Sequence, residues 1–412
     1  MPSFNIGLTG LNAASSDLQV TGHNIANSST AGFKRSRAEF ADVFALSYTG
    51  VSKTATGSGV NLASVTQQFT QGDLNFTDNN LDLAINGQGF FILDRGGITE
   101  YTRAGQFQVD REGFMVNAAG QRLMGYPPEG GNLLQPLQLT TGDSEPRPTS
   151  TIDALMNLSA EAEPIAIADD AVEIDPDDFD TFNYSTSLTV YDSLGSARTV
   201  SLFFQRQPPP EDKSWNVDAY MDVGGDFQKV NTDTGVLAFD QSGILDPDGI
   251  TPLTISAQGL PNGAADLNIE VDFGQTTQYG NKFSVAALRQ DGYAAGQLVS
   301  VDVDTDGTVF ARYSNGANRP LGQVALANFD NPQGLQPVGG TNWVVSSSSG
   351  EPLLGRGGES NFGLIQGGAY EAANVNIADQ LVKLITAQRN FQANAQVIST
   401  ADTLTQTIIN IR

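Results

Sequence analysis

Apolar residues recur at every seventh position at both ends of the chain. Leu8 and Leu381 occupy the intermediate heptad positions and widen each series into a seam. This spacing predicts one amphipathic helix over residues 3–26 and another that begins after Asn376, which is placed to cap it. The ten seam positions are Phe4, Leu8, Leu11, Leu18, Ile25, Ile377, Leu381, Leu384, Phe391 and Ile398.

Between the two ends the apolar residues alternate with polar ones. Leu83 and Ile85 are followed by an Asn86-Gly87 turn and by the apolar run Phe90–Leu93, which predicts a hairpin with a buried strand. A similar alternation returns from residue 292 to about residue 345. The fold class we expect is multidomain and mainly β. It has two β-rich domains, one inserted in the other, and terminal α-helices that pair as a coiled-coil-like inner domain.

This organisation predicts four parts. They are a terminal helical assembly domain from residues 1–27 and 373–412, an extended connector at 28–71, a discontinuous β domain from 72–147 and 291–372, and an inserted acidic outer β domain at 148–290.

The net charge of −25 is carried by the middle of the chain. Residues 148–290 hold 23 acidic and 6 basic side chains, a net charge of −17, whereas acidic and basic groups cancel at the two ends. An acidic middle argues against nucleic-acid binding, which needs clustered Lys and Arg. It predicts a self-repelling outer surface, while the nearly uncharged ends are suited to burial against other copies of the chain.

Composition argues against membrane helices, cysteine chemistry and a cleaved signal peptide. No segment has the roughly 18 apolar residues of a membrane helix, so no membrane insertion is expected. The chain has no cysteine, which removes disulfides and thiolate metal sites. No Lys or Arg precedes Lys34, so we expect no cleaved signal peptide.

Candidate catalytic groups are sparse. The sole histidine, His23, lies inside the first predicted helix, so neither a histidine metal cluster nor a Ser-His-Asp site can be built. Residues Asp302–Gly307 imitate the start of an EF-hand loop, but Tyr313 replaces the required Glu, and a β-hairpin turn is expected instead. We therefore expect no enzyme activity, metal or cofactor. Loose Ca²⁺ binding by the acidic run Asp169–Asp180 stays open.

The heptad ends have two interpretations. They could form a two-helix hairpin that caps a monomeric domain. However, two thin helices leave most of their surface exposed, so burial within one chain offsets little of the entropy lost on ordering them. We therefore infer that the ends stay disordered in the monomer and fold when several copies pack together.

Several motifs, which together span almost the whole chain, resemble the bacterial flagellar rod and hook axial protein family. The N-terminal signature residues are Asn24, Asn27, Gly32, Phe33 and Lys34. The other matching motifs are Leu11–Ser15, Ile85–Phe91, Tyr101–Phe107, Val190–Gly195, Tyr313–Gly316, Leu321–Phe329 and Ala387–Gln396. One difference is that Ala372-Ala373-Asn374 stands where the family often has Glu followed by Ala or Ser, Ser and Asn.

The resemblance implies a structural subunit of the flagellar hook, since the acidic insertion favours hook over rod members. It implies export without a cleaved signal peptide by the flagellar type III apparatus, and an extracellular homopolymer that forms a curved flexible tube. The rod subunit, hook cap and hook–filament junction proteins would be its neighbours. The alternatives are a distal rod or other flagellar axial subunit, or a monomeric extracellular Ca²⁺-binding β protein.

Overall fold

The chain divides into two compact units in the computed structural model. Unit 1 comprises residues 1–141, 300–312 and 318–412, and unit 2 comprises residues 142–299 and 313–317. Part of the expected connector, and Asp169 and Asp170 of the acidic run, lie outside the described residues. The structure describes residues 2–44, 57–139, 142–165, 173–209, 213–223, 226–231, 233–247 and 251–410.

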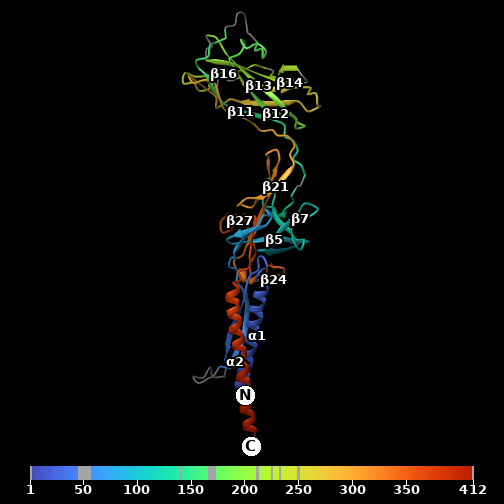
Figure 1. Ribbon diagram of the computed structural model, residues 1–412, viewed down its shortest axis with the longest axis vertical. Coiled ribbons are helices and arrows are strands. Elements are labelled where there is room, and N and C mark those ends of the chain that lie inside the picture. The colour runs from blue at the N-terminus through green and yellow to red at the C-terminus, as the bar shows by residue number, and fades with distance from the viewer. Residues whose placement is uncertain are drawn as a thin grey trace. The chain divides into compact units, whose positions relative to one another are not determined.

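The two terminal helices lie side by side in unit 1 (Figure 1). They are α1 (Pro2–Ala26) and α2 (Ile377–Asn410). The predicted cap of α2 is confirmed, because Asn376 Oδ1 accepts hydrogen bonds from the amides of Ala378 at 2.9 Å and Asp379 at 3.3 Å. Both helices therefore form where the heptad pattern places them.

Next to α1 lie two strands within the stretch expected as a connector. They are β1 (Ser36–Val43) and β2 (Gly59–Gln67), which pair antiparallel and contact α1. The predicted connector thus contains a small sheet that packs on the first helix.

The rest of unit 1 is built around a sheet of twelve strands among the described residues, ordered β21-β22-β23-β9-β5-β6-β25-β24 with four strands off this path. In β5, Phe91 and Leu93 join one hydrophobic cluster while Phe90 and Ile92 join another, so the strand is buried on both faces. This explains the unbroken apolar run in the sequence. The remaining strands of unit 1 are β3 (Leu74–Phe76), β4 (Leu83–Asn86), β5 (Phe90–Arg95), β6 (Ile98–Thr102), β7 (Phe107–Val109), β8 (Met115–Asn117), β9 (Arg122–Tyr126), β10 (Gln135–Pro136), β21 (Leu298–Val303), β22 (Thr308–Tyr313), β23 (Asn318–Asn328), β24 (Gln336–Gly339), β25 (Asn342–Val344), β26 (Leu353–Arg356), β27 (Leu364–Gly367) and β28 (Ala369–Glu371).

Unit 2 contains two five-stranded sheets among its described residues, ordered β17-β18-β11-β19 with β20 beside β11, and β12-β13-β14-β15 with β16 beside β14. Inward side chains of both sheets, such as Ile152, Trp215 and Ile269, form one shared core, which is the arrangement of a β-sandwich. Its strands are β11 (Thr151–Ser159), β12 (Tyr184–Tyr191), β13 (Ala197–Arg206), β14 (Ser214–Val223), β15 (Asp226–Lys229), β16 (Gly235–Ala238), β17 (Leu253–Ala257), β18 (Leu267–Asp272), β19 (Thr277–Tyr279) and β20 (Ser284–Gln290).

The predicted fold class is confirmed: the protein is mainly β, one β unit interrupts the other, and helices stand at both ends. The EF-hand-like segment is the predicted turn. It connects β21 to β22, and the amide of Gly307 donates to the carbonyl of Asp304 at 2.9 Å.

Candidate assembly site

Small and polar residues make the contact between the two terminal helices. Gly7, Ala14 and Thr21 are buried on α1, and they are spaced by seven residues. On α2 the buried residues include Gln380 and Ala387, which have the same spacing. The helices approach closely, because a Cβ added at Gly7 would lie 2.9 Å from Cγ1 of Ile398.

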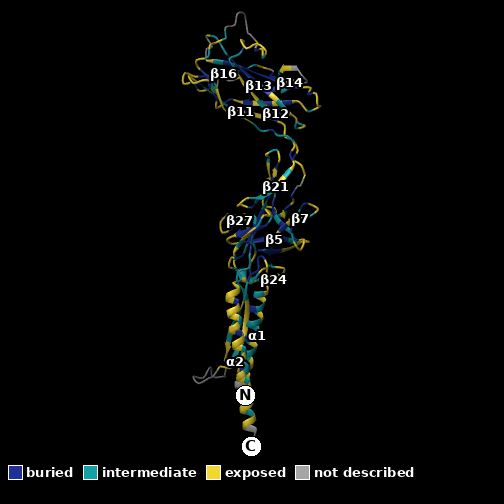
Figure 2. Cartoon of the chain, viewed as in Figure 1, coloured by how far each residue is buried: buried dark blue, intermediate teal, exposed yellow. Residues whose placement is uncertain are grey.

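Four of the ten seam residues stay exposed beside this contact, whereas Ile398 packs against Gly7 within it. Phe4 and Leu8 on α1 are 42% and 43% exposed, and Ile377 and Leu381 on α2 are 51% and 46% exposed. Figure 2 shows long exposed stretches along α2. The four exposed residues form two groups near opposite ends of the helix pair, because Gly7 packs against Ile398 and Asn24 binds Gln380. Grouped apolar side chains that stay exposed are candidates for a protein interaction site. The other six seam residues are partly buried, and they are Leu11, Leu18, Ile25, Leu384, Phe391 and Ile398.

A second apolar surface lies on the β1–β2 pair, and sequence reasoning missed it. Phe40, Leu62 and Val65 are 41%, 41% and 48% exposed. The signal was weak, because these residues are separated by polar ones and the stretch has no long alternating run. The described part of unit 1 therefore carries unpartnered apolar side chains on both helices and on the adjoining sheet.

The signature residue Asn24 fastens three elements together. Its side chain is 2% exposed, donates to the carbonyl of Ser36 at 2.8 Å, and accepts from the amide of Ser36 at 2.8 Å. It also donates to Oε1 of Gln380 at 3.2 Å. Asn24 thus joins the end of α1 to β1 and to the first turn of α2.

Asn27, Gly32 and Phe33 shape the chain as it leaves α1. The carbonyl of His23 accepts from the backbone amide of Asn27 at 3.2 Å and from Asn27 Nδ2 at 2.9 Å, which fixes Asn27 against the last turn of the helix. Gly32 has a φ of 67°, and a Cβ there would lie 2.3 Å from the amide of Ala104. Phe33 is buried and meets the ring of His23 edge-on at 5.5 Å, so the sole histidine has a packing role at this junction.

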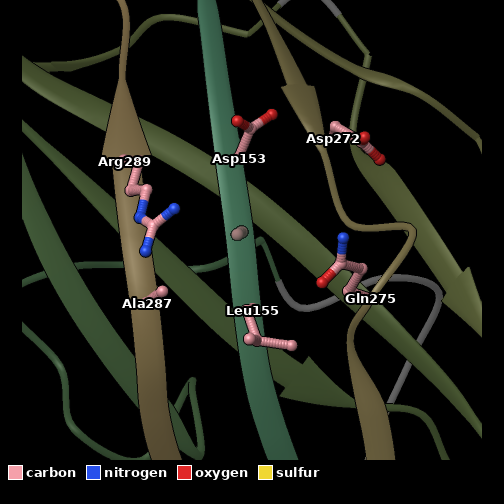
Figure 3. A pocket seen from close by; sticks show the side chains of 7 residues that line it. Asp153, Leu155, Asp272, Gln275, Ala287 and Arg289 are labelled. Atoms are coloured by element: carbon pink, nitrogen blue, oxygen red, sulfur yellow. The ribbon is translucent and has the colours of Figure 1, made fainter.

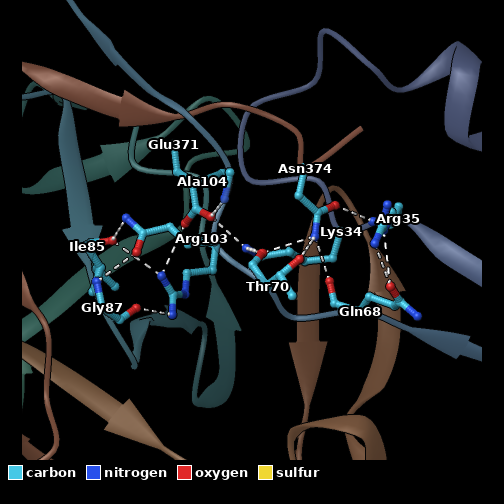
Figure 4. Close-up of polar contacts among 12 residues, drawn as sticks. Lys34, Arg35, Gln68, Thr70, Ile85, Gly87, Arg103, Ala104, Glu371 and Asn374 are labelled. Atoms are coloured by element: carbon cyan, nitrogen blue, oxygen red, sulfur yellow. Dashed lines mark hydrogen bonds and ion pairs between the residues drawn. The ribbon is translucent and has the colours of Figure 1, made fainter. Parts of the chain in front are cut away.

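The last signature residue, Lys34, belongs to a buried charged cluster (Figure 4). Its Nζ lies 2.6 Å from Oε1 of Glu371, whose other carboxylate oxygen lies 3.2 Å from Nη1 of Arg103. The side chains of Lys34, Arg103 and Glu371 are 1%, 5% and 0% exposed. Burial lowers the pKa of Lys34, although the neighbouring carboxylate acts in the opposite direction. We call these three residues the charged latch.

Sequence reasoning assigned no role to Glu371, Arg103 or Asn374. The segment Ala372–Asn374 differs from the family pattern, but the carboxylate that joins the charged cluster belongs to Glu371, the residue just before it. Asn374 itself accepts from the amide of Arg35 at 2.7 Å and donates to the carbonyl of Gln68 at 2.7 Å. These partners lie hundreds of positions apart in the sequence, so no local pattern indicates them.

The Val190–Gly195 motif forms a turn in unit 2 that is organised by Asp192. This carboxylate is fully buried and accepts hydrogen bonds from the amides of Leu194 at 3.0 Å and Ser196 at 2.9 Å. Burial raises its pKa, but the hydrogen bonds, including one from Asn262 at 2.6 Å, outweigh burial and hold the pKa below its usual value of 3.8.

A lowered pKa makes Asp192 a source of acid sensitivity. Its contribution to the stability of unit 2 is present above pH 3.8 and is lost as the pH falls through the lower folded-state pKa. We expect Asp192→Asn to destabilise unit 2 by about 1.5–3 kcal/mol at pH 7, with a smaller penalty in strong acid. Urea unfolding at several pH values measures this. Asp240→Asn is the control, since Asp240 caps a similar but exposed turn; equal losses from both variants would contradict the assignment.

A cavity of about 290 Å³ opens on the outer face of the β11 sheet in unit 2 (Figure 3). Its lining combines Asp153, Asp272 and Arg289 with the apolar Leu155.

Over the described residues, no three His, Asp or Glu side chains are grouped as metal ligands would be. Nor does any helix in that part of the chain have the length and apolarity to cross a membrane.

Models of known protein families match both ends and both β parts of the chain. The matches are "Flagella basal body rod protein" at 4–34, "Flagellar hook protein FlgE/F/G D1 domain" at 84–176, "Flagellar basal body protein FlaE D2 domain" at 157–293 and "Flagellar basal body rod FlgEFG protein C-terminal" at 366–411. Paired terminal helices around nested β units, matched in this way, define an axial protein of the bacterial flagellum.

Curated relatives give a closer assignment. The chain is 38% identical to the flagellar hook protein FlgE of Escherichia coli and 36% identical to that of Salmonella typhimurium, in each case over 100% of both chains. It is 32% identical to the protein of the same name from Borreliella burgdorferi, again over 100% of both. The chain belongs to the flagellar hook protein FlgE family, which confirms the resemblance predicted from its motifs.

The fold is also found in a solved structure. The crystal structure of Helicobacter pylori flagellar hook protein FlgE2 superposes with a TM-score of 0.55 at 15% identity, covering 71% of this chain and 99% of that one. At this identity the likeness concerns the fold alone.

Proposed function

We propose that this chain is the structural subunit of the flagellar hook, and that many copies assemble into a curved, flexible tube that transmits motor torque from rod to filament. Full-length membership of the hook protein family supports this role. The single structural observation that carries it is the exposed part of the apolar seam on the paired helices. In this role the chain works by assembly and has no catalytic step.

The terminal helices supply the rigid inner part of the tube. Within one chain, small residues of α1 pack against α2, so the four exposed seam residues Phe4, Leu8, Ile377 and Leu381 remain available to other copies. Burying the exposed half of each such seam residue between copies is worth about 0.7–1.5 kcal/mol. Because several such residues recur along each helix, successive copies bind cooperatively and form a continuous wall that resists twisting.

The acidic unit 2 supplies an outer surface that tolerates sliding. Residues 148–290 carry a net charge of −17, and like-charged surfaces repel one another weakly at physiological salt. Outer units of neighbouring copies can then shift past each other when the tube bends, without breaking a large apolar contact.

Assembly also explains the state of the chain before incorporation. The ends remain disordered in the monomer, which suits export in an unfolded state by the flagellar type III apparatus without a cleaved signal peptide. Once outside the cell, the subunits polymerise under a hook cap, between the rod subunits and the hook–filament junction proteins. The ends order as each copy joins.

Excision of residues 148–290 tests the division of labour. Arg147 and Tyr293 exchange two backbone hydrogen bonds, at 3.0 and 2.9 Å, so the deletion joins them through the two residues Asp291-Gly292. Asp-Gly is a favoured two-residue hairpin loop, and no residue of unit 1 is removed. We expect tubes in electron micrographs, with curvature or stiffness different from those of the full chain. A variant that folds but never polymerises would refute the division.

A further inference from the structure

We infer that Glu371 is a positioning residue that holds the pair of terminal helices in a fixed rotation relative to the β part of unit 1, so that twist passes through one buried carboxylate. This inference rests on the proposed torque-transmitting role and deepens it. The observation behind it is the charged latch, in which one side chain binds groups from three separate segments (Figure 4).

The position of Glu371 in the chain makes it a connector. It ends strand β28 six residues before α2 begins, and Lys34 follows the end of α1 by eight residues. Arg103 comes directly after β6 in the large sheet. A single carboxylate therefore joins the exit of the first helix, the entrance to the second and the sheet.

The contacts of Glu371 engage both oxygens of its carboxylate. Oε1 accepts from Lys34 Nζ at 2.6 Å and from the amide of Gly72 at 2.7 Å, while Oε2 accepts from Arg103 Nη1 at 3.2 Å. Lys34 also donates to the carbonyl of Thr70 at 2.9 Å. Hydrogen bonds between charged groups are shorter and stronger than those between neutral groups. The carboxylate therefore fixes both the distance and the direction of the two cationic side chains relative to Glu371.

No other carboxylate among the described residues lies within ion-pair distance of Lys34 or Arg103. Without the charge of Glu371, two buried cations would face each other with no anion between them, which is a costly arrangement. Lys34 and Arg103 can therefore form ion pairs only with Glu371. A small rotation of the helix pair changes these ion-pair distances.

Backbone bonds around the latch do not depend on this charge. The amide of Gly32 donates to the carbonyl of Glu371 at 2.8 Å, and the amide of Ala372 donates to the carbonyl of Asp73 at 2.8 Å. These bonds keep the segments adjacent when the charge is removed. The charge can therefore be tested apart from the fold.

The test compares Glu371→Gln with Glu112→Gln in the full chain. Glu112 forms an ion pair with Arg122 at 2.7 Å in the same unit, but its side chain is 67% exposed. We expect amide hydrogen exchange at Gly72 to become about tenfold faster or more in Glu371→Gln. Hooks built from this variant should lose torsional stiffness, measured from the elastic recoil of a bead on a hook with a stalled motor. The Glu112→Gln hooks should match wild type.

A second variant separates positioning from stability. Lys34→Met combined with Glu371→Gln removes one of the two unpaired cations, so the melting temperature of unit 1 should recover most of its loss while torsional stiffness stays low. Stiffness that recovers together with the melting temperature would overturn the inference, as would wild-type stiffness in Glu371→Gln hooks. Failure of the wild-type chain to form tubes would instead contradict the proposed function.

Discussion

Replacing Leu381 with Asp is expected to abolish tube formation while leaving the unfolding temperature of the isolated chain unchanged. Leu381 is 46% exposed when α2 pairs with α1 of the same chain, and in the dilute monomer we propose that this end is disordered. A charged residue there remains in water in either state. In the proposed tube the same position is buried between copies. Losing the burial of the exposed half of Leu381 costs about 0.7–1.5 kcal/mol, or roughly 3- to 10-fold in the critical concentration, and burying an unpaired carboxylate costs more.

Sedimentation and electron microscopy measure this effect. Leu8→Asp, on the other helix, is expected to behave in the same way because Leu8 is 43% exposed. Leu133→Asp is the matched control, since Leu133 is 77% exposed in unit 1 and belongs to the loop between β9 and β10 instead of a terminal helix, and this variant should polymerise normally. Normal tubes from the Leu8 and Leu381 variants would show that the seam is not an interface.

Replacing Gly105 with Ala adds a single methyl group and is expected to destabilise unit 1 strongly. A Cβ at this position would lie 1.6 Å from the carbonyl oxygen of Leu83. The amide of Leu83 in turn donates to the carbonyl of Gly105 at 2.8 Å, so the two backbones cannot separate without breaking that bond. Overpacking usually costs 1–3 kcal/mol, and we expect at least about 3 kcal/mol here because backbone must move.

Calorimetry of the full chain measures this change, because unit 1 and unit 2 have separate cores. The transition of unit 1 should fall in temperature while that of unit 2 stays in place. Gly22→Ala is the control. A Cβ at Gly22 meets nothing within 4 Å, and Ala is favoured over Gly in a helix by about 1 kcal/mol. An unchanged unit 1 transition in Gly105→Ala would contradict the packing described.

The terminal helices and the Asn376 cap of α2 could be predicted because their signals are local and, for the helices, periodic. The contact between them could not. Gly7, Ala14 and Thr21 recur every seven residues, as the apolar seam does, so the period alone cannot say which series faces the partner helix. Side-chain size decides: the small series on α1 permits close approach to α2, including to Ile398, whereas Phe4, Leu8, Ile377 and Leu381 stay exposed for other contacts.

The junction beneath the β part of unit 1 was only half predicted. Motif resemblance singled out Gly32 and Lys34, but their partners Arg103 and Glu371 lie far along the chain. A buried ion pair depends on tertiary packing, which neither periodicity nor composition encodes. Likewise, the paired strands β1 and β2 were expected as an extended connector, because their alternation is irregular and their order comes from packing on α1.

Hydrogen–deuterium exchange of the dilute chain and of assembled tubes tests most directly whether the ends acquire order through assembly. We predict rapid exchange over residues 4–25 and 377–398 in the dilute chain and strong protection of both stretches in tubes. Strand β5 should be protected in both states. Strong protection of the two helices already in the dilute monomer would contradict the account.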